Sequence, residues 1–225
     1  LYRHGYYRQK FTADGRTSVI YPRYEFTSYP IADTGVLISC PIGDHHVQVR
    51  IWRLQMGNTS ILLLDADLPE NAPEDRLLTE GLYKGESDQR MRQQMLLGVG
   101  GVMALEAMDE HVSVHHLNEG HAAFAAVERV ARFVENGSTL QDAIDHVRRT
   151  TIFTTHTPVP AGHDRYDPEA ASAAMRPVLE RAGLSPHEFA DLGRVHAGDE
   201  AEKLCMTVLA LRLSGRCRRS CSSPY

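Results

Sequence analysis

His111 to Thr157 reads HVSVHHLNEGHAAFAAVERVARFVENGSTLQDAIDHVRRTTIFTTHT, and this stretch decides the fold. Its apolar start, Val112–His115, predicts a short strand, and the β-branched run Thr150–Thr155 predicts a second one. Between them, apolar spacing predicts two helices, Ala122–Val134 and Thr139–Arg149. A strand, two helices and a further strand form a crossover unit, so we expect the two strands to lie parallel in one sheet.

The first third of the chain predicts an antiparallel β meander. Apolar runs alternate with turn residues, and strands are expected at Thr34–Cys40, Val47–Leu54 and Ser60–Leu64. Apolar and polar residues alternate along the middle run, which is the pattern of a half-buried strand. The fold class is therefore α/β, with an antiparallel β meander on the N-terminal side.

Further helices are expected on both sides of the crossover unit. A long helix begins at Ser87 and runs to about Met108, and it contains Gly98, Gly100 and Gly101. Glycines inside a helix indicate that a neighbouring element approaches closely. The other expected helices are Arg76–Tyr83, Pro168–Ala182, Ser185–Leu192 and Lys203–Leu213.

These patterns divide the chain into three parts. Residues 1–110 form a β-rich part together with the long helix, and residues 111–214 form an α/β crossover part. Residues 215–225 have no periodicity and no large aliphatic side chain. We therefore expect this tail to be unstructured and not to be the native continuation of the chain.

The balance of residue types is that of a globular protein in a reducing compartment. Hydrophobic residues make up 42% and charged residues 24% of the 225 residues, with a net charge of -5. The Lys and Arg residues are scattered, which argues against a nucleic-acid binder, and no apolar run reaches the ~18 residues of a membrane span. The four cysteines have no paired C-x-x-C spacing, so we expect free thiols and a cytoplasmic location.

Two polar loops follow the strands of the crossover unit. Leu117–His121 follows the first strand, and Thr154–Pro158 ends the second. Ligands of open α/β sheets bind outside the carboxyl ends of parallel strands, so these loops are expected to lie near each other. Their Asn, Glu, His and Thr residues supply donors and acceptors together, which suits a polyhydroxy ligand. Gly120 is expected to leave space for that ligand.

Two other interpretations remain open from the residues alone. In one, the loop residues only satisfy one another at the strand ends. In the other, a metal ion is bound by a subset of six residues, although no His-Glu-x-x-His motif supports this and no metal ligand is assigned. The six residues are His115, His116, Glu119, His121, His156 and His163.

These loops resemble segments of a known family. Val114–Phe124 is similar to the Leu-Asn-Glu-Gly-His segment of bacterial α-glucan phosphorylases, which act on glycogen or maltodextrin, and Thr154–Asp164 resembles the next strand and loop. Further matches run in order from Leu1–Gln9 through Leu64–Arg76 to Met206–Ser214, so the resemblance covers nearly the whole chain.

The resemblance implies an enzyme that transfers glucosyl units from α-1,4-glucan ends to inorganic phosphate, giving glucose 1-phosphate. It implies a Rossmann-like glycosyltransferase lobe, one of two in the family fold, and an often homo-oligomeric protein. His156 matches the catalytic position at the sugar, and Lys84–Asp88 falls where the family has a gate. The residues that match the substrate-binding positions are Asn118, Glu119, His121 and Thr157.

The resemblance also implies what this chain lacks. The family holds pyridoxal phosphate as a Schiff base, but its cofactor lysine and main phosphate-binding residues match nothing here, so no cofactor-binding residue is assigned. The match stops after Ser214, where the tail looks like an out-of-frame continuation. We therefore expect an internal, inactive fragment of the N-terminal lobe. The alternatives are a glucan-binding or interaction module without catalysis and, last, a metal-dependent hydrolase.

Overall fold

The computed structural model describes residues 8–11, 14, 17–20, 30–81, 87–157 and 162–219. The chain forms two compact units. The first comprises residues 1–39 and 47–90, and the second comprises residues 40–46 and 91–225. From Met91 onward the long helix therefore belongs to the second unit, whereas the sequence-based division placed the whole helix with the β-rich part.

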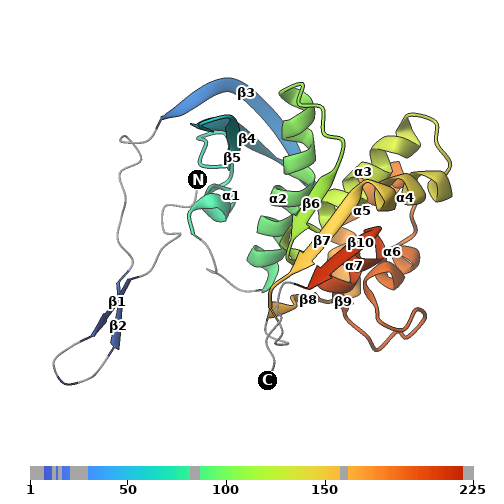
Figure 1. Ribbon diagram of the computed structural model, residues 1–225. Coiled ribbons are helices and arrows are strands. Elements are labelled where there is room, and N and C mark those ends of the chain that lie inside the picture. Colours follow the sequence, from blue (N-terminus) through green and yellow to red (C-terminus); the bar gives the residue numbers. More distant parts are fainter. Residues whose placement is uncertain are drawn as a thin grey trace. The chain divides into compact units, whose positions relative to one another are not determined.

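The first unit is built around a three-stranded antiparallel sheet in the order β3-β4-β5 (Figure 1). Its strands are β3 (Ile31–Ile42), β4 (His45–Met56) and β5 (Thr59–Asp65), so the predicted meander is confirmed with longer strands. Along β4, Val47, Val49 and Ile51 are buried and alternate with partly exposed residues, as the sequence pattern indicated.

The loop after β5 is fastened to the meander by a buried asparagine. The Asn71 side-chain amide donates to the carbonyls of Gln48 and Ala66 at 2.7 and 2.8 Å, and its oxygen accepts the Gln48 amide at 2.8 Å. The loop leads into two short helical turns, α1 (Pro73–Arg76) and η2 (Leu77–Thr79). This unit also contains the antiparallel pair β1 (Arg8–Phe11) and β2 (Thr17–Ile20).

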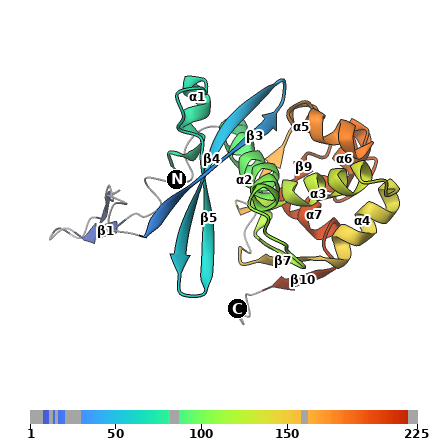
Figure 2. The same cartoon turned by 90° about the horizontal axis from the view of Figure 1, so that it is seen from above.

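The second unit contains a three-stranded parallel sheet in the order β10-β7-β6. Its strands are β6 (His115–Asn118), β7 (Thr151–Thr155) and β10 (Arg216–Arg219). The helices α3 to α7 gather on one face of this sheet, as the two views show (Figures 1 and 2). The predicted parallel crossover is therefore confirmed, with His115 opposite Thr151 and Asn118 opposite Thr154.

The helices of this unit mostly follow the predicted ranges. They are α2 (Ser87–Ala107), η3 (Gly120–Ala122), α3 (Phe124–Glu135), α4 (Leu140–Arg149), α5 (Pro168–Ala182), α6 (Pro186–Gly193) and α7 (Met206–Arg212). A short antiparallel pair, β8 (Arg165–Tyr166) and β9 (Leu204–Cys205), replaces the start of the helix expected from Lys203.

Close packing of α2 on α3 explains one of the three helix glycines. A Cβ atom at Gly98 would lie 2.7 Å from the Ala125 nitrogen, so only glycine permits this approach. At Gly101 a Cβ atom would meet nothing within 4 Å, so the close-approach prediction is wrong for that residue. The core beneath these helices includes the fully buried rings of Phe124, Phe153 and Phe189.

The structure corrects two other predictions. The first crossover strand lies three residues later than Val112–His115, because pairing with β7 buries Leu117 to 4% exposure while Val112 and Val114 stay exposed. The tail is not wholly unstructured, because Arg216–Arg219 forms β10 along β7. Residues 220–225 lie outside the described residues.

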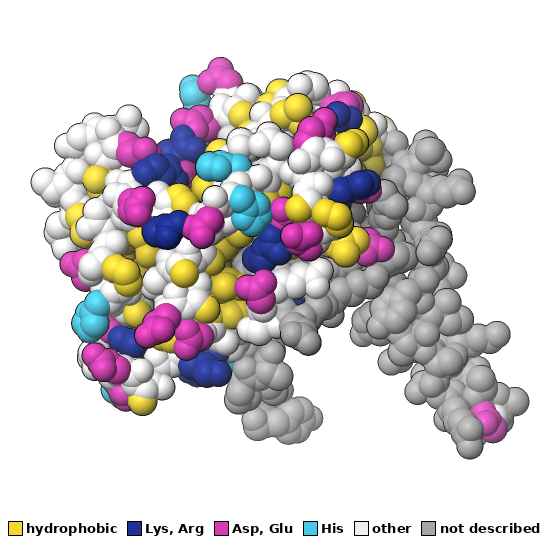
Figure 3. All heavy atoms as spheres, turned by 180° about the vertical axis from the view of Figure 1, so that it is seen from behind, with side chains coloured by type: hydrophobic (Ala, Val, Ile, Leu, Met, Phe, Trp, Pro, Cys, Tyr) yellow, Lys and Arg dark blue, Asp and Glu magenta, His cyan; other side chains and the backbone are white. Residues whose placement is uncertain are grey.

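On the face shown in Figure 3, acidic and basic side chains of the described residues intermingle, and no basic stripe crosses it. Among the described residues, no helix is both long and apolar enough to cross a membrane.

Candidate functional site

The two polar loops lie side by side at the carboxyl edge of the parallel sheet. Asn118 ends β6 and faces Thr154 near the end of β7, so the chain leaves both strands at the same edge (Figure 1). The main chain ties the loops together, because the Glu119 amide donates to the Thr154 carbonyl at 2.8 Å. The proximity expected from the crossover topology is confirmed.

Glu119 connects the loops through its carboxylate. Oε1 accepts the His156 amide at 2.6 Å and the Thr157 hydroxyl at 3.2 Å, and Oε2 accepts the Thr155 hydroxyl at 3.1 Å. The side chain is buried, and the backbone has φ of 61°, a left-handed conformation that a residue with a Cβ seldom adopts. Such strain persists where surrounding bonds hold it, and here the loop ends hold it.

The ionisation of Glu119 follows from these contacts. Burial acts to raise the pKa of its carboxyl group, but the hydrogen bonds from His156, Thr155 and Thr157 outweigh burial, and the pKa is lowered. The carboxylate is therefore charged at neutral pH and occupied by donors of its own chain. In this arrangement Glu119 braces the loop that carries His156.

His156 and Asn118 form the exposed part of the edge. The imidazole Nε2 of His156 lies 2.9 Å from the Asn118 Oδ1, and both residues are exposed. In the tautomer with hydrogen on Nε2, the imidazole donates to the amide oxygen, and the Asn118 amide group keeps two N–H donors. A neutral imidazole and a primary amide together suit a hydroxyl-bearing ligand better than an anion.

Thr157 contributes to the contact between the two loops more than to the exposed surface. It is half-buried, and its hydroxyl donates to Glu119. Its methyl group also contacts the position of Gly162, where any Cβ atom would collide with the Thr157 side chain. Residues 158–161 between them lie outside the described residues.

His121 belongs to a second polar group. Its Nδ1 lies 3.7 Å from the Asp164 carboxylate and 3.5 Å from the Gln94 amide nitrogen, while Gln94 donates to Asp164 at 2.7 Å. The Tyr166 hydroxyl donates to the Gln94 oxygen at 3.0 Å. The polar contacts of the His121 side chain are therefore with Gln94 and Asp164.

Sequence reasoning missed Gln94, Asp164 and Tyr166. A signal was available in α2, where Gln94 is a buried amide within the glycine-rich helix, and buried amides require partners. The partners themselves come from residues about seventy positions later, and no local pattern indicates that pairing.

Gly120 serves packing, which corrects the expectation that it leaves space for a ligand. A Cβ atom there would lie 3.0 Å from the Met206 Cβ and 3.1 Å from the Thr207 nitrogen. The start of α7 therefore already occupies that space. The Met206 amide also donates to the Asp164 carbonyl at 3.0 Å, which holds α7 beside the edge.

The remaining histidines are distributed among separate contacts. His116 Nε2 lies 2.7 Å from the Thr154 hydroxyl, and His163 Nδ1 lies 2.8 Å from the Thr207 hydroxyl. His115 lies at the opposite end of β6. Within the described residues, no three His, Cys, Asp or Glu side chains converge as a metal site would require.

The chain is similar over most of its length to several phosphorylases. It is 40% identical over 220 residues to the maltodextrin phosphorylase of Thermococcus litoralis, a match of 95% of this chain and 26% of that protein. It is 38% identical over 231 residues to the glycogen phosphorylase of Mycobacterium tuberculosis, with 96% and 27% covered. With the glycogen phosphorylase of Aquifex aeolicus it shares 28% identity over 220 residues, with 95% and 32% covered.

These matches cover only part of each relative. The chain spans between 26% and 32% of the length of these three proteins. A comparison with protein-family models finds no match. The aligned region covers nearly the whole chain. The chain is therefore a homologue of part of the glycogen and maltodextrin phosphorylases and matches about a quarter of their length.

Proposed function

We propose that this chain forms the part of an α-glucan phosphorylase that contacts the sugar. The whole enzyme transfers a glucosyl unit from the non-reducing end of an α-1,4-glucan to inorganic phosphate and releases glucose 1-phosphate. The observation that carries the proposal is the carboxyl edge, where Glu119 fixes the backbone of His156 and leaves the imidazole exposed beside Asn118. In this proposal the chain is part of a Rossmann-like glycosyltransferase lobe.

His156 is the residue to which we assign contact with the reacting sugar. Its imidazole and the Asn118 amide supply donors and acceptors at hydrogen-bonding distance from each other, as neighbouring sugar hydroxyls require. Glu119 and Thr157 position this pair, because their mutual hydrogen bond holds the segment that follows β7. His121 lines the pocket from the separate group that it forms with Gln94 and Asp164.

The residues of the two loops do not by themselves fit pyridoxal phosphate. A Schiff base needs a lysine, and a phosphate cradle needs a glycine-rich loop with cationic side chains, whereas neither loop contains these features. We assign the cofactor to the part of the enzyme that this chain does not match. When bound there, pyridoxal phosphate supplies the proton-transfer chemistry of its phosphate group.

The chain alone is proposed to be inactive because it contributes only one side of the site. The proposal also places the enzyme in the cytoplasm as a homo-oligomer. The gate at Lys84–Asp88 stays a prediction, since residues 84–86 lie outside the described residues.

A chimera tests the proposal. This chain replaces the matching segment of the Thermococcus litoralis maltodextrin phosphorylase, to which it is 40% identical. We expect the chimera to release glucose 1-phosphate from maltoheptaose and phosphate, and the isolated chain to release none. A folded chimera that binds maltoheptaose without phosphorolysis would reject the enzymatic assignment.

The second candidate function is a glucan-binding module without catalysis. It is favoured by the exposed pair of His156 and Asn118, whose donors and acceptors suit sugar hydroxyls whether or not turnover follows. Isothermal titration of the isolated chain with maltopentaose distinguishes the candidates when read beside the chimera. Binding to the isolated chain with no turnover in the chimera supports the module, and cellopentaose serves as the β-linked control.

A further inference from the structure

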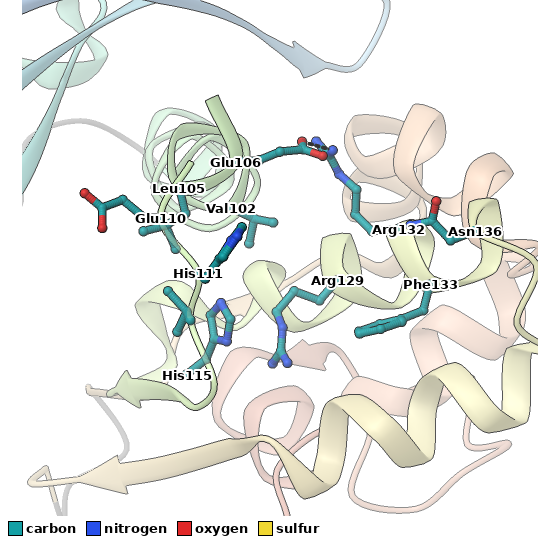
Figure 4. Close-up of a pocket in the computed structure, with 11 residues that line it drawn as sticks. Val102, Leu105, Glu106, Glu110, His111, His115, Arg129, Arg132, Phe133 and Asn136 are labelled. Atoms are coloured by element: carbon teal, nitrogen blue, oxygen red, sulfur yellow. Dashed lines mark hydrogen bonds and ion pairs between the residues drawn. The ribbon is translucent and has the colours of Figure 1, made fainter. Parts of the chain in front are cut away.

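A cavity of about 370 Å³ opens at the amino edge of the parallel sheet, at the opposite end of β6 from the candidate sugar site (Figure 4). Its walls come from the C-terminal half of α2, the loop before β6 and the C-terminal half of α3. The volume falls in the range of small-molecule sites, about 300–1,000 Å³. The principal lining side chains are Val102, Leu105, His115, Arg129, Arg132 and Phe133.

Arg129 brings a buried positive charge to this cavity. The residue is 7% exposed, and its guanidinium donates to the hydroxyls of Thr151 and Thr150 at 2.6 Å each. Both hydroxyls are neutral, and among the described residues Arg129 forms no ion pair. Burial lowers the pKa of Arg129 to about 10, so it remains protonated at neutral pH.

The charge of Arg129 therefore lacks a local counter-charge. Two of its five N–H groups are used by the threonines, which leaves three that can donate elsewhere. Burying a charge in a protein interior without a counter-charge is energetically unfavourable. An anion placed in the cavity would remove much of that penalty.

His115 supplies a second incomplete group. Its Nδ1 is buried and has no hydrogen-bond partner among the described residues. Figure 4 shows its imidazole beside the Arg129 side chain, at the same end of the cavity. Buried polar atoms are nearly always paired, so the His115 Nδ1 beside the Arg129 guanidinium is a candidate contact for a ligand.

Arg132 is the second cationic side chain on the cavity wall, and it already forms ion pairs. Arg132 pairs with Glu106 on α2 and donates from Nε to the buried Glu128 at 2.7 Å. Figure 4 shows the Arg132–Glu106 pair away from His115. Glu110 lies at the cavity as well. Between the charged groups the wall is apolar, formed by side chains such as Val102, Leu105 and Phe133.

We propose that this cavity binds a small organic anion, one acidic group on a compact apolar body. The acidic group lies against the Arg129 guanidinium and the Nδ1–H of His115. The apolar body lies against Val102, Leu105 and Phe133. The site is separate from the carboxyl edge and does not depend on the function proposed above.

The probe for this site is benzoate, which carries a carboxylate on an apolar ring. We expect titration of the ¹⁵N-labelled chain with benzoate to shift the His115 and Arg129 side-chain signals, with saturation in the millimolar range or below. Benzyl alcohol is the neutral control, and inorganic phosphate tests the charge without the apolar body. Phenyl phosphate shows whether the site prefers a phosphate group or a carboxylate.

The matched variants are His115→Leu and Arg148→Gln. His115→Leu keeps the cavity wall apolar and removes one of the two donors, so benzoate affinity should fall at least about tenfold, equivalent to ~1.4 kcal/mol. Arg148 is an exposed arginine on α4, and its replacement should leave affinity unchanged. Equal binding of benzoate to the wild type and His115→Leu, equal binding of benzyl alcohol, or no saturable shift overturns the proposal.

Discussion

The buried polar side chains near the two ends of strand β6 differ in how fully they are hydrogen-bonded. At the carboxyl end, the buried carboxylate of Glu119 accepts hydrogen bonds from three consecutive residues, Thr155 to Thr157. At the amino end, within the part of the chain that the structure describes, the buried Arg129 donates to neutral hydroxyls and the His115 Nδ1 has no hydrogen-bond partner. A satisfied buried group fixes its neighbours, whereas an unsatisfied one indicates that something else binds there.

Under the proposed function, the comparison separates residues that position the site from residues that contact the sugar. At the carboxyl edge the positioning residue is hidden, and the side chains it positions, His156 and Asn118, are exposed. Glu119 and His156 are therefore hydrogen-bonded neighbours with different expected phenotypes. Replacing each one in turn tests whether this separation is real.

The largest effect is expected from Glu119→Ala. The replacement leaves the His156 amide and two threonine hydroxyls without their acceptor, and bonds to a charged acceptor contribute about 1.5–3 kcal/mol each. We expect the free energy of unfolding to fall by about 4 kcal/mol in urea titrations. The control is Glu180→Gln, an exposed glutamate on α5. A loss no larger than the control's would show that Glu119 does not brace the edge.

A smaller effect, on turnover alone, is expected from His156→Ala in the chimera. Positioned polar contacts to a reacting group contribute about 2–4 kcal/mol to transition-state stabilisation, so kcat/KM should fall by roughly 30- to 1,000-fold. Because His156 is exposed, the free energy of unfolding should change by less than about 0.5 kcal/mol. His187→Ala on α6 is the matched control. Unchanged turnover removes His156 from the site.

Local patterns predicted the parts of this fold that side chains specify. The alternation of Val47, Val49 and Ile51 gave the sheet face of β4, and the two loops were brought together by crossover topology. β10 was missed because an edge strand needs only main-chain hydrogen bonds, and the sequence around Cys217 offers no apolar pattern.

The sequence also predicted more about the carboxyl end of β6 than about its amino end. Asn118, Glu119 and His156 were identified from residue type and strand-end position. The separate roles of Glu119 and His156 could not be predicted in this way. They depend on the left-handed backbone at Glu119, which turns its carboxylate toward the end of the next strand. The amino-end cavity was missed entirely, since Arg129 has the periodic position of an ordinary helix residue and its burial comes from tertiary packing.

A pH experiment sharpens the comparison at the carboxyl end. The pKa of Glu119 is lowered in the folded state, so its contribution to stability is complete above the ordinary value of 4.5 and is lost as pH falls through the lower folded pKa. The stability difference between wild type and Glu119→Gln should therefore be constant near neutral pH and shrink below about pH 4.5. Urea unfolding across this range measures it. A difference that grows on acidification contradicts the lowered pKa.

The smallest effect is expected at the amino end, where His115→Leu should stabilise the protein. The replacement removes a buried nitrogen that has no hydrogen-bond partner among the described residues, and removing such a group stabilises a protein by about 1 kcal/mol. Burial, with a further contribution from the charge of Arg129, lowers the pKa of His115 from 6.5 to about 4. The unfolded chain therefore takes up a proton near pH 6.5 that the folded chain refuses until about pH 4. Wild-type stability must fall over that interval, whereas the leucine variant avoids this loss.

The stability advantage of His115→Leu over the wild type in urea unfolding should thus be larger at about pH 5 than at about pH 7.5, with His187→Leu unchanged within about 0.5 kcal/mol. A destabilised His115→Leu would mean that the imidazole is satisfied in solution, and the contrast between the two ends of β6 would disappear.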